Sequence, residues 1–176
     1  ASGRQWCAHK MGIDLSEDGL YGMKPIDVFS GTIHSSAIKS LSMLGMGRKS
    51  WRSLRLLTGR EALDVQDLDE KLAAKKGEPC IVVASSGTVN TGDFDEIAKI
   101  AALKEKYQFW LHVDAAFGGF VACSSRHQYL AQGMELADSV TIDLHKWLNV
   151  PDDFKDVASQ IHGAEDDFQG HRSDCP

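Results

Sequence analysis

A lysine and a carboxylate each stand just beyond a short apolar run of this sequence. Lys146 comes after the run of residues 139–142, and Asp114 comes after the run of residues 109–113. A lysine at a buried strand end can be desolvated, which lowers its pKa and makes its amine a Schiff-base nucleophile. A carboxylate across the same site can hold a protonated ring nitrogen. These two residue types therefore point to Schiff-base chemistry on a flat ring.

Further residues would complete such a site. Small side chains after the carboxylate, among them Ala116, leave room for a flat ring. Thr88 lies in a glycine-containing loop that leads into a helix, and such a loop suits an anion because its free N–H groups point at it. His34 stands at the start of another helix. A lysine, a ring-nitrogen carboxylate and polar anchoring groups are the parts that a pyridoxal-phosphate site needs.

Each of these residues also has an ordinary structural interpretation. Lys146 alone could be a solvated surface residue, and Asp114 alone could cap a helix or form a turn. His34 could be a neighbour of a helix N-cap or a hydrogen-bonded core histidine, and the loop around Thr88 could be only a turn. The combination of these residues and their order along the chain favour the chemical interpretation.

The elements that must hold these residues alternate between short apolar runs and longer amphipathic runs. The continuous apolar run of residues 80–84 is typical of a parallel strand buried on both faces. Strand, loop, helix and strand in this order predict an α/β fold with a mostly parallel sheet flanked by helices. Such sheets place ligand sites beyond the carboxyl ends of their strands. The predicted strands are residues 26–29, 51–57, 80–84, 109–113 and 139–142, and the predicted helices are residues 35–44, 65–76 and 95–107.

Composition and charge exclude several classes of protein. The chain has 176 residues, of which 43% are hydrophobic and 25% charged, so it is neither disordered nor of low complexity. Its formal net charge of −6 would repel phosphates, so we expect no nucleic-acid and no anionic-membrane partner. No apolar run reaches the length of about 18 residues that a membrane span needs, and the first residues lack a signal-peptide core. We therefore expect a cytoplasmic protein.

The cysteines give no sign of a metal site. Cys7, Cys80, Cys123 and Cys175 are far apart and form no C-x-x-C pair, so we expect no zinc site and no redox motif. Scattered cysteines of this kind favour reduced thiols over disulfides.

Four segments resemble motifs of the group II pyridoxal-phosphate-dependent amino acid decarboxylases, which include the aromatic-L-amino-acid, histidine and glutamate decarboxylases. Residues 111–119, Leu-His-Val-Asp-Ala-Ala-Phe-Gly-Gly, look like the family signature His-Val-Asp-Ala-Ala. Residues 143–147, Asp-Leu-His-Lys-Trp, look like its lysine motif Asn/Asp-Pro-His-Lys-Trp, with leucine in the usual proline position. Residues 86–95 are similar to its Gly-Thr-Thr…Gly-x-Phe-Asp segment, and residues 33–36 to its Ala-His-Ser-Ser segment. The match is specific because the four motifs occur in the family's order.

The resemblance implies the large domain of a fold-type I pyridoxal-phosphate-dependent transferase, here incomplete. It implies that Lys146 forms the internal aldimine, that Asp114 salt-bridges the pyridine nitrogen, and that His34 lies over the ring face opposite Ala116. These first three would be the catalytic residues. Thr88 would lie near the oxygen substituent of the ring, and Asp143 and His145 near the phosphate, with Asp143 replacing the amide often found there. The implied cofactor-binding residues are thus Lys146, Asp114, His34, Thr88, Ala116, Asp143 and His145.

The implied function is decarboxylation of an L-amino acid to an amine and CO2, in an enzyme that forms a homodimer at full length. A protonated pyridinium held by Asp114 would serve as the electron sink for the carbanion left when CO2 departs. Two alternatives remain open. The chain could be a non-catalytic fragment or pseudo-enzyme that cannot hold the cofactor, or it could be a lyase or aldehyde synthase on the same scaffold. The family's phosphate-binding loop would lie upstream of Ala1, and no segment matches its proton-donor tyrosine.

The resemblance predicts a boundary near Pro151. Residues 1–151 would be part of the cofactor-binding large domain, and residues 152–176 an atypical acidic tail outside the family fold. The tail holds seven acidic and two basic residues, so it carries −5 of the net charge of −6. It contains no β-branched run, so we expect no further strand there and interpret the chain as a truncated copy of the enzyme. The alternative interpretation of residues 152–176 is a divergent surface extension.

Overall fold

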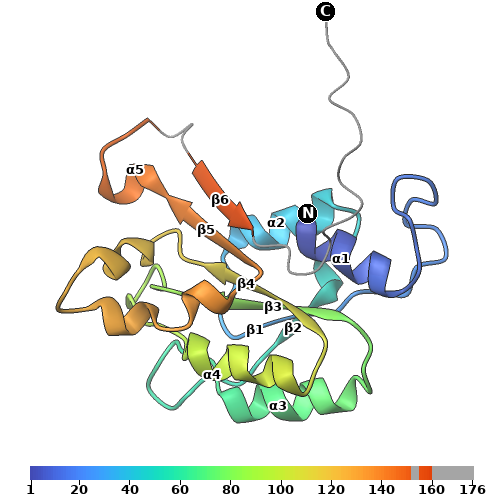
Figure 1. Cartoon of the computed structure of the whole chain (residues 1–176), viewed down its shortest axis with the longest axis horizontal. Helices are drawn as coiled ribbons and strands as arrows, with labels where there is room; N and C mark the ends of the chain where they lie inside the picture. Colours follow the sequence, from blue (N-terminus) through green and yellow to red (C-terminus); the bar gives the residue numbers. More distant parts are fainter. Residues whose placement is uncertain (152–154, 160–176) are drawn as a thin grey trace, which may run out of the picture.

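A six-stranded sheet with the strand order β2-β1-β3-β4-β5-β6 forms the centre of the molecule (Figure 1). The structure, a computed structural model, describes residues 1–151 and the strand of residues 155–159. Strands β1 to β5 are parallel and β6 is antiparallel to β5. The strands are β1 (Val28–Ser30), β2 (Trp51–Ser53), β3 (Cys80–Ser85), β4 (Phe109–Asp114), β5 (Ser139–Asp143) and β6 (Lys155–Ser159). The parallel sheet flanked by helices confirms the predicted fold class.

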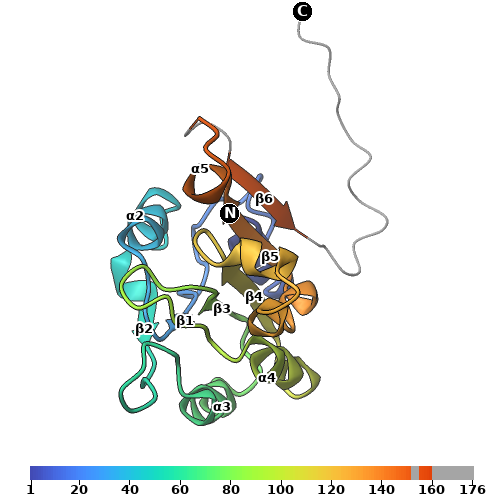
Figure 2. The same cartoon turned by 90° about the vertical axis from the view of Figure 1, so that its left-hand side faces the viewer.

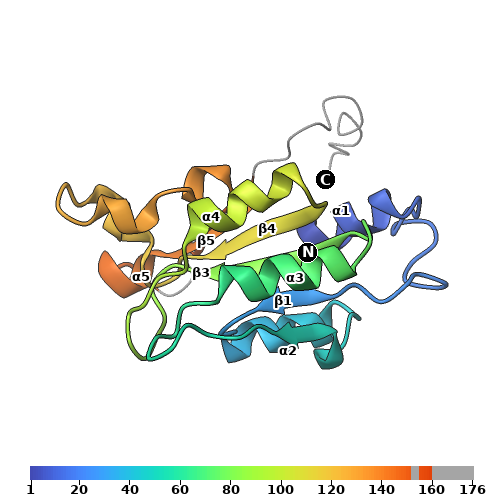
Figure 3. The same cartoon turned by 90° about the horizontal axis from the view of Figure 1, so that it is seen from below.

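Helices cover both faces of the sheet, as Figures 2 and 3 show. Helices α3 and α4 lie on one face, and α1 and α2 lie on the other. The α-helices are α1 (Ser2–Lys10), α2 (Ser35–Met43), α3 (Val65–Ala74), α4 (Ile97–Ala102) and α5 (Leu144–Trp147). Short 3₁₀ helices are η1 (Arg48–Ser50), η2 (Leu103–Glu105), η3 (Gly119–Cys123), η4 (Gln128–Ala131) and η5 (Met134–Leu136). None of the helices in the described residues is long and apolar enough to cross a bilayer.

The two layers arise because side chains alternate across the central strands. In β4, Leu111 packs with Leu68 of α3 and Ile100 of α4, whereas the neighbouring Trp110 packs on the opposite face with Cys7 of α1. Each Leu or Ile side chain that is fully buried stabilises the fold by roughly 1.5–3 kcal/mol relative to an exposed one. The run of residues 80–84 is buried throughout, as a strand covered on both faces must be.

Side-chain caps set the starts of two predicted helices. His34 precedes α2, and its Nδ1 accepts a hydrogen bond from the backbone N–H of Ser36 at 3.3 Å. Asp64 precedes α3, and its Oδ1 accepts one from the N–H of Gln66 at 2.9 Å. Each cap satisfies an N–H that has no partner inside the helix. Gly77, with a φ of 85°, follows the end of α3 in a conformation that glycine adopts without strain.

Several elements differ from the prediction, and one of them is the strand predicted over residues 51–57, which ends at Ser53. Helix α1 lies in the polar N-terminal segment, where no helix was predicted. The helix predicted over residues 95–107 is an α-helix only from Ile97 to Ala102 and continues as the 3₁₀ helix η2. Strand β6 is present although no strand was expected beyond Pro151, and it pairs with the whole of β5. Apart from residues 155–159, the predicted acidic tail of residues 152–176 lies outside the described residues.

Candidate active site

Asp114 ends β4 at the carboxyl edge of the parallel sheet. It is in register with Ser85 at the end of β3 and with Thr141 in β5. Its Oδ1 accepts a hydrogen bond from the N–H of Ala116 at 3.2 Å, and the next residue, Ala115, is fully buried. The carboxylate is therefore held at the edge where ligands of parallel sheets bind.

Lys146 lies in the short helix α5, which begins directly after β5. Its Nζ lies 3.1 Å from Oδ2 of Asp143, and the side chain of Lys146 is 30% exposed against 12% for Asp143. The indole Nε1 of Trp147 donates a hydrogen bond of 2.6 Å to the carbonyl oxygen of Phe117. This bond joins α5 to the loop that follows Asp114, so the lysine and the carboxylate belong to two segments that are fastened together.

His34 belongs to a loop that is tied to the same edge. The carbonyl oxygen of Thr32 accepts hydrogen bonds from the hydroxyls of Ser30 at 3.1 Å and Ser85 at 3.3 Å. Because Ser85 is in register with Asp114, these bonds bring the loop that ends at His34 to the end of β3. The Nδ1 atom of His34 lies 2.7 Å from the Ser36 hydroxyl.

Thr88 uses its hydroxyl inside its own loop. The Oγ1 atom accepts a hydrogen bond from the N–H of Asp93 at 3.0 Å and lies 2.9 Å from the hydroxyl of Thr91. The same loop touches the loop after β4, because the N–H of Gly118 donates to the carbonyl oxygen of Ser86 at 2.9 Å. A Cβ atom on Gly118 would collide with the Ser86 backbone. Two loops that follow neighbouring strands are therefore joined by a backbone hydrogen bond at a point where there is no room for a side chain on residue 118.

Asp95 supports this region, although the sequence reasoning assigned it no role. It is 5% exposed, and its carboxylate accepts backbone hydrogen bonds from Ser85 at 2.6 Å and from Leu63 at 2.7 Å. Burial raises the pKa of Asp95 to about 6, although both N–H donors favour the charged form. The sequence feature that could have identified Asp95 is its position in the segment that resembles Gly-x-Phe-Asp.

A second set of contacts holds the same loop at the protein surface. Asp93 accepts hydrogen bonds from the Arg60 guanidinium at 2.6 and 3.1 Å, in a bidentate arrangement. The hydrogen bond from Arg60 holds the pKa of Asp93 below its ordinary value. The neighbouring Glu61 accepts from the hydroxyl of Thr91 at 2.7 Å. No motif in the sequence indicated that residues 60 and 61 contact residues 93 and 91, which lie about 30 positions later in the chain.

His112 was also missed as a residue of this region. It lies two positions before Asp114 in β4, so the two side chains leave the same face of the sheet. Its Nδ1 lies 2.8 Å from the Ser139 hydroxyl, and its Nε2 lies 3.4 Å from the Thr141 hydroxyl. Burial lowers the pKa of His112, and the nearby Asp114 charge only partly opposes that effect. The imidazole is therefore neutral near neutral pH.

The structure brings the four predicted segments to one edge of the sheet, but few of the predicted site residues contact one another directly. Of the predicted residues, Asp143 and Lys146 are an ion pair. Asp114 and Ala116 are joined by a hydrogen bond, and His34 and Thr88 reach the edge through the loops described above. His145 lies beside Lys146 in α5.

Neither a metal cluster nor a disulfide is found in the described part of the chain. There, no group of three or more His, Cys, Asp or Glu side chains could hold a metal ion. Cys7 and Cys80 are buried free thiols whose pKa burial raises to about 12, and Cys123 is an exposed free thiol. Cys175 lies outside the described residues.

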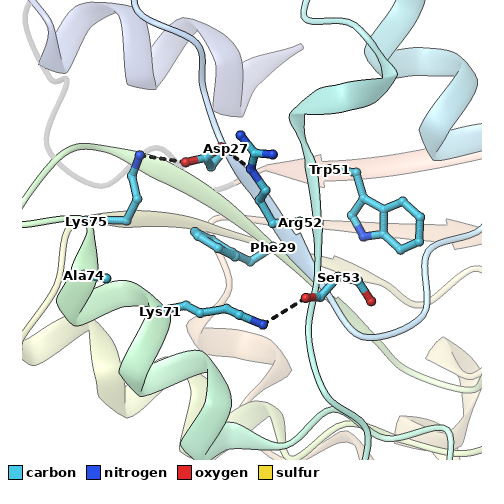
Figure 4. Close-up of a pocket in the computed structure, with 8 residues that line it drawn as sticks. All are labelled: Asp27, Phe29, Trp51, Arg52, Ser53, Lys71, Ala74 and Lys75. Carbon is cyan, nitrogen blue, oxygen red and sulfur yellow. Dashed lines mark hydrogen bonds and ion pairs between the residues drawn. The ribbon is translucent and has the colours of Figure 1, made fainter.

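A hollow of about 430 Å³ lies elsewhere, between α3 and the strands β1 and β2 (Figure 4). The lysine and arginine side chains that line it already have hydrogen-bond partners. Lys75 and Arg52 both bind Asp27, at 2.8 and 2.7 Å, and Lys71 donates to the carbonyl oxygen of Ser53. None of the predicted site residues lines this hollow, so it is separate from the edge that carries Lys146. Its lining residues are Asp27, Phe29, Trp51, Arg52, Ser53, Lys71, Ala74 and Lys75.

Fold and site together define an α/β protein whose parallel sheet carries a lysine and a carboxylate on adjoining segments of its carboxyl edge. Comparison with known families gives the particular class. The profile of the pyridoxal-dependent decarboxylase conserved domain matches residues 8–160. The chain belongs to this family, and the match continues beyond Pro151 through the residues of β6, where the resemblance was expected to end.

Named relatives and solved structures agree with this assignment. The chain is 37% identical over 139 residues to the acidic amino acid decarboxylase GADL1 of Bos taurus, covering 77% of this chain and 26% of the relative. The crystal structure of mouse CSAD in apo form matches with a TM-score of 0.81 at 29% identity, covering 96% of this chain and 38% of that one. The structure of Oryza sativa TDC with PLP matches with a TM-score of 0.78 at 25% identity, covering 90% and 34%. The chain thus spans about a quarter of the length of the bovine relative.

The side chains at the edge fit pyridoxal phosphate, the cofactor of this family. The Lys146 amine is partly exposed and suits an aldehyde, and the Asp114 carboxylate suits a protonated ring nitrogen. Gly87 and Gly118 let the loops after β3 and β4 approach each other closely, because a Cβ on either glycine would collide with the backbone of the other loop. An amine and a carboxylate on adjoining segments are the Schiff-base lysine and the ring-nitrogen partner that this cofactor uses.

Proposed function

We propose that this chain provides the reactive edge of a pyridoxal-phosphate-dependent amino acid decarboxylase, which converts an L-amino acid to an amine and CO2. The observation that carries the proposal is the fastening of the Lys146 helix to the Asp114 loop by the Trp147–Phe117 hydrogen bond. Family membership supports the same reaction. Because the chain spans a minor part of its relatives, the activity is proposed for the whole protein.

Each predicted residue has a role in this proposal. Lys146 is the residue that binds the cofactor covalently through Nζ, and Asp114 keeps a proton on the ring nitrogen by Coulomb attraction. His34 and Ala116 bound the two faces of the ring. When bound, the cofactor supplies an electron sink for the electron pair left behind by CO2.

The remaining polar residues position and anchor. Thr88 belongs near the oxygen substituent of the ring, and its loop is held in place by the contact between Gly118 and Ser86. His145 and Asp143 belong on the phosphate side. The neutral His112 beneath Asp114 adds no positive charge that would compete with the ring nitrogen for the carboxylate.

The same proposal includes an amino acid substrate, a homodimer at full length and a cytoplasmic location. The family resemblance supports the substrate and the homodimer, and the widely spaced cysteines of the sequence support the cytoplasmic location. The relatives are named for acidic amino acids and for other substrates, so the proposal keeps the substrate at the level of an L-amino acid.

Lys146→Ala tests the assignment. We expect the wild-type chain mixed with pyridoxal phosphate to develop a visible absorption band of the lysine-bound cofactor, and Lys146→Ala to lose the band completely because the attachment atom is gone. Lys99→Ala is the matched control, since Lys99 is an exposed lysine of α4 that also pairs with an acidic residue three positions earlier. Failure of the wild-type chain to form a lysine-dependent band would contradict the proposal.

The products separate decarboxylation from the alternatives. A panel of L-amino acids incubated with the loaded full-length protein should yield CO2 and the corresponding amine. An aldehyde together with ammonia would favour an aldehyde synthase. Absence of turnover with a normal band would favour the non-catalytic alternative.

A further inference from the structure

A chain of side-chain hydrogen bonds lies beneath Asp114, on the face of the sheet that α1 and α2 cover. The indole Nε1–H of Trp110 donates to the Ser139 hydroxyl at 2.9 Å, and the same hydroxyl lies 2.8 Å from Nδ1 of His112. The Nε2 atom of the same ring lies 3.4 Å from the Thr141 hydroxyl. The proposed function uses only the neutral charge of His112 and leaves these contacts unexplained.

The chemistry of the groups fixes the direction of these bonds. An indole N–H can only donate, so the Ser139 oxygen accepts from Trp110. The Ser139 hydroxyl has one proton of its own, and within the described residues the acceptor in its reach is Nδ1 of His112. Burial lowers the pKa of His112, so the ring carries a single proton near neutral pH. With Nδ1 as the acceptor, that proton is on Nε2.

The opposite tautomer would leave a buried proton without a partner. With the ring proton on Nδ1, the Ser139 oxygen would receive two N–H groups, and its own proton would have no acceptor in the described part of the chain. Ser139 is 6% exposed, and a buried donor without a hydrogen bond is costly. Burial is the main cause of the lowered His112 pKa, and the attraction of the Ser139 carbonyl for a ring proton opposes it only weakly. The Nε2–H tautomer therefore satisfies more of the buried groups.

The register of the sheet shows where this proton points. His112 is in register with Ser139, the partner of Nδ1, whereas Asp114 is in register with Thr141, the partner of Nε2. The ring thus reaches from its own position in β4 toward that of Asp114, which lies on the same face and nearer the carboxyl edge. A Thr141 hydroxyl that accepts from Nε2–H keeps its own proton for another acceptor, and Asp114 presents a carboxylate in register with it.

We propose that His112 is a positioning residue that acts on Asp114 through Thr141, and that the Ser139 hydroxyl fixes the ring proton of His112 on Nε2. The chain of bonds then ends in a hydroxyl donor beside the Asp114 carboxylate, whose Oδ1 already accepts from the N–H of Ala116 at 3.2 Å. Two donors fix the orientation in which the carboxylate meets a ring nitrogen. This inference rests on the proposed function and extends it to the layer of side chains beneath Asp114.

The position of the ring proton can be measured without cofactor. In the full chain carrying ¹⁵N-labelled histidine, nitrogen NMR distinguishes a ring nitrogen that bears a proton from one that does not, and His112→Gln identifies the signals of His112. We expect a protonated Nε2 and an unprotonated Nδ1 at neutral pH. A proton on Nδ1, or a mixture of the two tautomers, would overturn the proposal.

Ser139→Ala removes the hydroxyl that donates to Nδ1. We expect its His112 signals to show the Nδ1–H tautomer as well, because the Ser139 backbone carbonyl can then compete for a proton on Nδ1. Ser139→Thr keeps a hydroxyl and should retain the wild-type signals. Ser50→Ala is the matched control, since Ser50 is also 6% exposed and its hydroxyl donates to the Gly47 carbonyl at 2.7 Å. That control should leave the His112 signals unchanged, and an unchanged tautomer in Ser139→Ala would contradict the proposal.

Two cofactor compounds test whether the chain of bonds acts through Asp114. The first is pyridoxal phosphate, and the second is its analogue in which a CH group replaces the ring nitrogen. His112→Asn has a shorter amide that does not reach Thr141, so it should weaken the affinity for pyridoxal phosphate about threefold to tenfold, as for the loss of one hydrogen bond. Its affinity for the analogue should stay that of wild type, because the analogue offers Asp114 no nitrogen.

His112→Gln is the conservative variant, since its longer amide can donate from the position of Nε2. It should keep most of the affinity for pyridoxal phosphate. An equal loss for both compounds in His112→Asn would mean that the substitution only disturbs the fold around it, and unchanged affinity for both would mean that His112 has no influence on Asp114. Either result would overturn the positioning role.

The two proposals fail in different ways. If the wild-type chain forms no lysine-dependent band with pyridoxal phosphate, the proposed function fails, whereas the tautomer of His112 is still read in the cofactor-free chain. If the band forms but the ring proton is on Nδ1, the positioning role fails and the proposed function stands.

Discussion

Asp95 is a buried carboxylate whose two oxygens each accept one backbone hydrogen bond, from Ser85 and from Leu63. These bonds join the end of β3, beside Asp114, to the segment that precedes α3. Burial nevertheless outweighs the two donors and raises the pKa of Asp95 to about 6. The folded protein therefore holds a proton on this group more tightly than the unfolded chain does.

This shift predicts a pH-dependent contribution to stability. The contribution of Asp95 is full below about pH 4 and is lost as the pH rises through about 6, because the folded-state pKa is raised. Across that window we expect the difference in unfolding free energy between wild type and Asp95→Asn to change by on the order of 2–3 kcal/mol, in favour of wild type at the acidic end.

Urea unfolding of both proteins at several pH values measures the difference. Glu17→Gln removes an exposed carboxylate and is the control for a general change of charge. A difference between wild type and Asp95→Asn that stays constant across the window would contradict the assigned pKa.

At the scale of loops and elements, the contact between Gly118 and Ser86 predicts intolerance of a side chain. We expect Gly118→Ala to lower the free energy of unfolding by about 1–3 kcal/mol, because the added Cβ would push the two loops apart. The same substitution should weaken cofactor binding, since the Thr88 loop and the Asp114 loop separate.

Thermal unfolding and cofactor titration measure the two effects of Gly118→Ala. Gly12→Ala is the control, because Gly12 also lies in a loop and a Cβ there meets no atom within 4 Å. That control should lose stability only through its positive φ of 74° and should bind cofactor normally. Normal cofactor binding by Gly118→Ala would show that the loop contact does not position the site.

Elements with strong hydrophobic patterns were predicted well from the sequence. The apolar runs of β3 and β4 and the periodic faces of α2 and α3 are found close to the expected residues. The start of α4 was predicted too early because Asp95, at the expected start, binds Ser85 and Leu63 instead. That long-range use of a side chain has no signature in a single sequence.

Helix α1 and strand β6 were not predicted from the sequence, for a different reason. Helix α1 buries only small residues, Gly3, Cys7 and Ala8, so it lacks the large apolar stripe that marks a helix. Gly3 lies against Trp110, where a Cβ would be 2.9 Å from the indole ring. Strand β6 lacks β-branched runs, and its pairing with β5 is made by backbone groups that are common to all residues.

The candidate site was predictable as a set of segments and less so as a set of contacts. The order of motifs indicated that Lys146, Asp114, His34 and the Thr88 loop meet, and the structure brings their segments to one edge of the sheet. The contacts that hold the segments together, such as Trp147 with Phe117 and Arg60 with Asp93, join residues about 30 positions apart. Such pairs depend on the folded geometry and leave no local pattern.

For the whole molecule, ion pairs predict a loss of stability in acid. Burial acts to raise the pKa of Asp27, but its hydrogen bonds to Lys75 and Arg52 outweigh that effect and hold the pKa below its ordinary value. Arg60 likewise lowers the pKa of Asp93. A lowered carboxylate pKa stabilises the fold above the unfolded value of about 4, and that stabilisation is lost as the pH falls further.

We therefore expect the free energy of unfolding to fall steeply below about pH 4, and Asp27→Asn to make that fall shallower. Asp27→Asn should also be less stable than wild type at neutral pH, because Lys75 and Arg52 lose their shared partner. Chemical unfolding as a function of pH measures both effects. If the free energy of unfolding of Asp27→Asn falls as steeply in acid as that of wild type, this ion-pair cluster does not control the loss of stability in acid.

The hydrogen bond from Trp147 to Phe117 gives the site an optical signal of its own. Trp147 is 57% exposed and adjoins Lys146, whereas Trp110 is 4% exposed within the core. Fluorescence from Trp147 should therefore be quenched by a chromophore attached at the neighbouring lysine, while the fluorescence of Trp110 reports on the fold. Among the four tryptophans of the chain, Trp147 and Trp110 thus distinguish an event at the reactive edge from a change in the core.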